Sequence, residues 1–169
     1  DEVQVVDEVL DRGISNGSSV AVKLAIENKA DIHVVNEWPL YLACTRARDD
    51  VICTLLEHKA LPQRRSSILI NAIRYCRIDT IRRLLESNAQ ISINTYTDKT
   101  FTSLQQAMWR SDIPIIDLLL KSGANPNICN ITMNHIRGDL NMYNSKTTMQ
   151  KLIMCLRSGW VLPDDVLAY

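Results

Sequence analysis

Apolar residues recur along this chain at fixed distances from a leading leucine. Counted from Leu40, apolar residues follow at offsets of twelve, fifteen, sixteen and twenty positions. The same offsets give apolar residues from four further starting points, Leu10, Leu69, Leu104 and Leu140. The five starting points lie 30, 29, 35 and 36 residues apart. Self-similarity with this period is typical of proteins built from stacked repeats.

Within each repeat the apolar positions have helical spacing. One such stripe consists of Val51, Ile52, Leu55 and Leu56, and it predicts an amphipathic helix with one buried face. Each repeat therefore reads as a helix, a tight turn, a second helix and a loop. We predict an all-α fold of about five such units in a single domain over residues 1–169. The approximate unit boundaries are 1–31, 32–61, 62–94, 95–128 and 129–163.

The second helix of each unit ends in a short polar stretch. Gly123 and Gly159 stand where a residue just past a helix adopts left-handed dihedral angles. Lys29, Lys59 and Asn88 occupy the same place in other units. Since a side chain destabilises this conformation, the lysines are expected to reduce stability.

Two kinds of segment resemble the ankyrin repeat. Residues 121–127 (KSGANPN) and 27–33 (ENKADIH) are similar to the family's "xxGADxN" end of the second helix, and residues 38–43 (WPLYLA) and 102–107 (TSLQQA) to its "TPLHLA" start of the first helix. The resemblance implies a solenoid of helix–turn–helix units that binds a protein partner. Partners in this family usually contact the loop tips and the exposed side of each first helix, which line a concave face.

No unit keeps an intact T-P-L-H motif. In the family, the Thr and His of this motif join adjacent loops by hydrogen bonds. Tyr41 takes the His position, and we interpret it as a loop-packing residue. The longer connectors, 90–103 and 125–139, are where loops specific to this protein are expected.

Charge and hydropathy narrow the function classes. Lys and Arg number 19, as do Asp and Glu, so the formal net charge is zero. This balance argues against a dedicated nucleic-acid binder, which usually has a basic excess. The apolar runs are too short to span a membrane. Because the chain begins at Asp1 without a signal peptide or an initiator Met, we expect it to be a fragment of a longer protein.

Five cysteines are present, an odd number without close pairs: Cys44, Cys53, Cys76, Cys129 and Cys155. Such a set is typical of reduced thiols packed as small hydrophobic side chains. A cytoplasmic or nuclear location is expected on this ground.

The sequence contains no catalytic or cofactor-binding motif that we can identify. The three histidines, His33, His58 and His135, lack metal-ligand spacing, and C-x-x-C and glycine-rich phosphate-binding patterns are missing. Adjacent acids such as Asp49 and Asp50 point about 100° apart on a helix, which does not suit an acid–base pair. We therefore predict no enzyme activity, no cofactor and no metal.

The repeat register also suggests a binding surface. Five and six residues after the leading leucines stand four cations, Arg46, Arg74, Arg110 and Lys146, with Tyr75 and Trp109 beside two of them. Arg, Tyr and Trp dominate protein-binding hot spots, and a row of cations favours an acidic segment. The alternative is that these are ordinary solvated side chains at helix ends, where cations suit the helix dipole.

We interpret the chain as a protein–protein interaction module: a scaffold, an adaptor or an inhibitory domain. One alternative is a regulatory segment of a larger enzyme or channel. Another is an enzyme in its own right, which requires clustered titratable groups in a cleft. The sequence predicts neither the identity of the partner nor the oligomeric state.

Overall fold

The computed structural model describes residues 2–62, 67–87, 91, 93–96, 101–128 and 145–162. The chain divides into two compact units, Asp1–Ile91 and Ser92–Tyr169, called unit 1 and unit 2 below, and each is described by itself. A single domain over residues 1–169 stays a prediction. Among the described residues, no helix is both long enough and apolar enough to cross a membrane.

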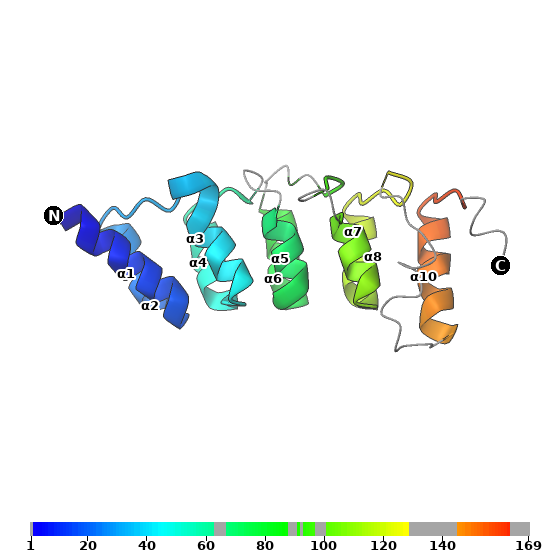
Figure 1. The fold of residues 1–169 in the computed structure, drawn as a ribbon, viewed down its shortest axis with the longest axis horizontal. Coiled ribbons are helices and arrows are strands. Elements are labelled where there is room, and N and C mark those ends of the chain that lie inside the picture. The colour runs from blue at the N-terminus through cyan, green and yellow to red at the C-terminus, as the bar shows by residue number, and fades with distance from the viewer. Residues whose placement is uncertain are drawn as a thin grey trace. The chain divides into compact units, whose positions relative to one another are not determined.

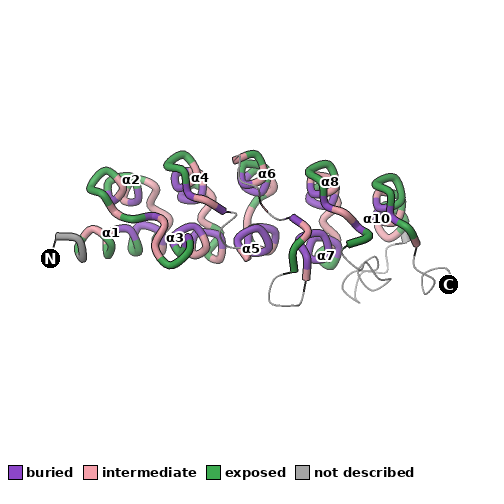
Figure 2. Tube along the Cα trace, turned by 90° about the horizontal axis from the view of Figure 1, so that it is seen from above, coloured by how far each residue is buried: buried purple, intermediate pink, exposed green. Residues whose placement is uncertain are grey.

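Unit 1 consists of three helical hairpins (Figure 1). Their helices are α1 (Glu2–Asn16), α2 (Ser19–Glu27), α3 (Val34–Thr45), α4 (Asp49–Glu57), α5 (Ser67–Tyr75) and α6 (Ile78–Glu86). The first helices pack on one another, α1 on α3 and α3 on α5, and the second helices do likewise, α2 on α4 and α4 on α6. Figure 2 shows these two layers with their buried residues turned toward each other.

The repeated apolar positions form the core between the two layers. The most deeply buried of them in unit 1 are Val22, Leu40, Ile52, Leu55, Ile81 and Leu84. Ala43 and Ala72, three residues after a leading leucine, are also fully buried. Their small side chains let α3 and α5 approach closely, because a larger side chain has no room at this density of packing. Leu56 and Leu85, at offset sixteen, are only half-buried.

The left-handed residues that end the second helices are where the sequence predicts them. Gly123 and Gly159 have φ of 95° and 82°, and Lys29 and Lys59 have φ of 69° and 67°. The Lys59 N–H donates to the Leu56 carbonyl at 3.0 Å, which satisfies an end carbonyl of α4. The prediction for these four positions is confirmed, and the fifth, Asn88, lies outside the described residues.

Replacing Lys59 by glycine is expected to stabilise the chain by about 0.5–1 kcal/mol, because glycine adopts a positive φ without steric cost. Urea unfolding followed by circular dichroism measures this difference. The matched control is Lys121→Gly at the end of α8, inside a helix, where glycine is expected to destabilise by up to about 1 kcal/mol. Two changes of the same sign would contradict the assignment of Lys59 to the left-handed position.

Unit 2 contains the hairpin α7 (Ser103–Trp109) and α8 (Ile113–Lys121), and the helix α10 (Ser145–Arg157), with α8 packed against both others. Its first helix begins with a capping box. The Thr102 hydroxyl accepts the Gln105 N–H at 3.3 Å, and the Gln105 side chain accepts the Thr102 N–H at 2.8 Å. At the start of α8, the Asp112 carboxylate accepts the Ile115 N–H at 3.2 Å. Local sequence therefore sets where both helices begin.

Two asparagines connect successive loops of unit 2. The Oδ1 atom of Asn94 accepts the Asn125 N–H at 2.8 Å, and its Nδ2 donates to the carbonyl of the glycine after α8 at 3.2 Å. Asn127 makes the same two bonds to the next loop, with the Val161 N–H and the carbonyl of the glycine after α10, each at 2.8 Å. These amides join the loops in the way that the missing Thr and His of the motif otherwise would.

In unit 1 a glutamate has the corresponding role. Glu37 is fully buried, and its Oε2 accepts the N–H of Leu61, which occupies the same repeat position as Asn125 and Val161. The distance is 3.1 Å, and Oε1 lies 2.7 Å from Nδ1 of His33. Three consecutive residues here, 35–37, have positive φ, so the right-handed part of α3 begins at residue 38.

Candidate functional site

The predicted partner-binding residues of unit 1 lie at the C-terminal ends of α3 and α5. Arg46 follows the last residue of α3, Arg74 lies in the last turn of α5, and Tyr75 ends α5. Arg46 is exposed, Arg74 is half-buried and Tyr75 is 54% exposed. The Cys76 thiol donates to the Cys44 carbonyl oxygen at 3.6 Å, which brings the two helix ends together. The three predicted residues therefore share one end of unit 1.

In unit 2, two of the predicted residues have a comparable position. Trp109 is the last residue of α7 and Arg110 follows it; both are exposed. The Trp109 ring is tilted against the ring of Phe101, with 6.4 Å between the centroids. Lys146 differs from the other cations, because it lies in the first turn of α10 rather than at the end of a helix. It is exposed as well.

The cations at these helix ends have a structural explanation, and the aromatic side chains beside them do not. A cation near a helix C-terminus is stabilised by the helix dipole, so Arg46, Arg74 and Arg110 are favourable where they are. The dipole gives no reason for aromatic side chains there. Tyr75 and Trp109 remain accessible at the same ends, and an exposed aromatic beside arginines is typical of protein contact surfaces. Guanidinium groups bind carboxylates in two-point hydrogen bonds, which suits an acidic partner.

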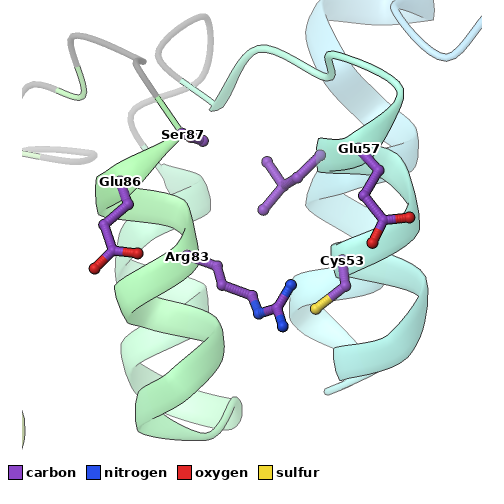
Figure 3. Close-up of a pocket in the computed structure, with 6 residues that line it drawn as sticks. Cys53, Glu57, Arg83, Glu86 and Ser87 are labelled. Carbon is purple, nitrogen blue, oxygen red and sulfur yellow. The ribbon is translucent and has the colours of Figure 1, made fainter.

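A second candidate feature is a groove between α4 and α6 (Figure 3). It encloses about 240 Å³ and is lined by Cys53, Leu56 and Glu57 of α4 and by Arg83, Glu86 and Ser87 of α6 and its end. In Figure 3 the Arg83 side chain reaches from α6 toward the Cys53 sulfur. The groove thus combines one cation, two acids and a thiol between second helices.

The surroundings of Cys53 disfavour ionisation of its thiol. Burial raises its pKa above the usual value of 9.0, and the positive charge of Arg83 only partly opposes this. Nearby acids, Asp50, Glu57 and Asp49, raise the pKa further. Since the thiolate is the nucleophile, this cysteine is not an activated one. The thiol in the groove is therefore a weak nucleophile.

The sequence reading located the helix-end residues and missed the groove. Cys53 and Cys155 both lie on second helices, and both were expected to be packed thiols. Cys155 is fully buried, whereas Cys53 is half-buried and lines the groove. The groove depends on Arg83 of α6 lying beside Cys53, Leu56 and Glu57 of α4, a contact between hairpins that the repeat register does not indicate. Tyr41 stacks on Trp38 of the same helix, α3, with 5.3 Å between ring centroids, and its loop-packing role stays a prediction.

Among the described residues, no three His, Cys, Asp or Glu side chains are grouped so that they could hold a metal ion. His33 is paired with Glu37, and His58 follows the last residue of α4. His135 lies outside the described residues.

One comparison with known proteins gives a match. Residues 101–131 match the family model of the ankyrin repeat, a segment that contains the hairpin of α7 and α8 and the connecting Asn127. No curated protein is similar enough to the chain to count as a relative. Ankyrin repeats are in general non-catalytic elements that bind other proteins. The chain thus contains an ankyrin repeat within an all-α repeat fold, and an ankyrin repeat is typical of protein–protein interaction modules.

Proposed function

We propose that this module recognises an acidic segment of its partner through the ends of its first helices. In unit 1 the contact residues are Arg46, Arg74 and Tyr75. In unit 2 they are Trp109 and Arg110, with Lys146 in the first turn of α10 as a further cation. The observation that supports this most strongly is Tyr75, which is more than half exposed next to Arg74 at the end of α5, where α5 packs on α3. We assign these contacts to the concave side of the repeats on the ground of the family's usual mode of binding.

The chemistry of these residues favours carboxylates. Arg presents several N–H donors in a planar fork that matches a carboxylate, and exposed aromatic rings supply apolar contact at low entropic cost. The acid nearest in sequence, Asp49, is already bound to the neighbouring hairpin through the Arg77 N–H at 3.3 Å. The contact surface of unit 1 therefore has a positive character that an acidic peptide complements.

Affinity capture with mass spectrometry tests the proposal. The wild-type chain is compared with two variants, Arg74→Ala with Tyr75→Ala in unit 1 and Trp109→Ala with Arg110→Ala in unit 2, each shown to be folded by circular dichroism. Removing an Arg–aromatic pair from a contact surface is expected to weaken binding of the captured partner at least about tenfold.

The matched control is Arg82→Ala with Arg83→Ala on α6, where both side chains are exposed in the other layer of unit 1. This variant is expected to bind the partner as the wild type does. A partner lost by the α6 variant and kept by both helix-end variants would contradict the proposal and assign binding to the groove of Figure 3. If binding also falls steeply with salt, the acidic nature of the partner segment is supported.

A further inference from the structure

Two cysteines from neighbouring hairpins meet in unit 1. Cys44 is the last but one residue of α3 and is fully buried. Cys76 directly follows α5 and is half-buried. They are 32 residues apart in the chain, and the packing of α3 on α5 brings them together. Each lies on a segment that the repeat core holds in place.

The Cys76 side chain reaches the backbone of Cys44. Its thiol donates to the Cys44 carbonyl oxygen at 3.6 Å. The pKa of the Cys44 thiol is raised well above 9.0, first by hydrogen bonding with the Cys76 side chain and then by burial. Because the Cys76 sulfur already contacts Cys44, adjustments of the two side chains bring the thiols to the separation at which a disulfide forms.

We propose that Cys44 and Cys76 form a reversible disulfide, a modification site that joins the second and third hairpins. A peroxide is the oxidant. The half-buried Cys76 sulfur attacks one peroxide oxygen, the O–O bond breaks, and the products are a sulfenic acid and water. The Cys44 sulfur then attacks the Cys76 sulfur, the S–O bond breaks, and the hydroxyl leaves as a second water with the thiol proton. Each cysteine sulfur gives up one electron, and the peroxide takes up both.

The other described cysteines have different surroundings. Cys53 lies on α4 in the groove beside Arg83, and Cys155 is buried in α10 of unit 2. The bond between Cys44 and Cys76 also has a structural consequence. It closes a loop of 32 residues and so restricts the unfolded chain, which raises resistance to unfolding. It ties together the helix ends that carry Arg46, Arg74 and Tyr75.

Peptide mapping tests the proposal directly. In a variant with Cys53→Ser, Cys129→Ser and Cys155→Ala, only Cys44 and Cys76 remain. The folded, reduced protein is treated with a small excess of hydrogen peroxide, alkylated with iodoacetamide and digested with trypsin. We expect a linked pair of peptides, 30–46 and 75–77, that separates on treatment with dithiothreitol. The oxidised protein is expected to unfold at a higher temperature than the reduced protein.

The wild-type chain, mapped in the same way, serves if the three substitutions disturb folding. Adding Cys76→Ser is the matched control, and it is expected to abolish the linked pair. Full alkylation of both thiols after peroxide, or oxidation of Cys76 to the sulfinic acid without linkage, would overturn the proposal. A linked pair that forms only between two different chains, detected as a covalent dimer, would overturn it too.

Discussion

The free energy of unfolding is expected to rise by about 3 kcal/mol between pH 8 and pH 10.5 because of one buried lysine, Lys151. Its side chain is fully buried in unit 2. The Nζ atom donates to the Met108 carbonyl at 2.7 Å and to the Ser111 hydroxyl at 2.8 Å. Burial lowers the pKa of Lys151 from 10.5 to about 8. The charged amine is thus disfavoured in the folded state.

The sign follows from proton binding in the two states. Below pH 8 the amine is charged in both states, and the folded state bears the full cost of the buried charge. Between pH 8 and pH 10.5 the folded state releases the proton while the unfolded state keeps it. Stability rises with pH wherever the unfolded state binds more protons, here by up to about 1.4 kcal/mol per pH unit. A neutral amine still has donors for both oxygens.

The measurement is the difference between the wild type and Lys151→Met in urea unfolding across this pH range. Taking the difference cancels the contributions to stability that both chains share. One of them comes from Cys44, whose raised pKa lowers stability as pH rises above 9.0. Lys151→Arg is the second comparison, since a guanidinium stays charged throughout and gains nothing from the pH change. A difference between wild type and Lys151→Met that is flat or falls with pH contradicts the prediction.

Replacing Glu37 by alanine is expected to destabilise unit 1 by about 2–3 kcal/mol. The change removes the acceptor of the Leu61 N–H and the partner of His33, and it leaves space where a fully buried side chain was. A partner lost from a charge-assisted hydrogen bond costs about this much. Because Glu37 connects two loops, the loop at Leu61 is also expected to exchange its amide hydrogens faster. Urea unfolding and hydrogen exchange measure the two effects.

Glu8→Ala on α1 is the matched control for the Glu37 prediction. Glu8 accepts from Arg12 at 2.6 Å, but both side chains are largely exposed, and such a pair contributes little. Its loss is expected to change stability by less than about 0.5 kcal/mol. Equal effects of the two substitutions would show that the buried bond to Leu61 does not connect the loops.

This chain differs from the ankyrin motif in the residues that connect its loops, but the loop-to-loop hydrogen bonds are kept. Glu37, Asn94 and Asn127 make these bonds. In the family, the Thr and His of the motif join the loops. All three bonds reach the backbone N–H at the same repeat position, 21 residues after a leading leucine, at Leu61, Asn125 and Val161. A backbone N–H donates to any suitably placed side-chain oxygen, so the repeat tolerates different residues here.

The sequence by itself determined the helices, their ends and the core. Helical periodicity depends on neighbours three and four residues away, so the stripe of Ile52 and Leu55 suffices to predict a buried helix face. The left-handed Lys29 and Lys59 follow equally from their place after a helix. The six candidate contact residues come from the same register; their role in binding stays a prediction.

The tertiary structure alone decided which side chains meet across the hairpins. Glu37 and Leu61 are 24 residues apart, Cys44 and Cys76 are 32 apart, and Lys151 and Met108 are 43 apart. Such pairs form only once the helices stack, because connectors of unequal length separate their partners and no local pattern fixes the contact. That packing buries Lys151 and brings Cys44 and Cys76 together. The pH dependence and the redox chemistry expected of this chain follow from these two results of the packing.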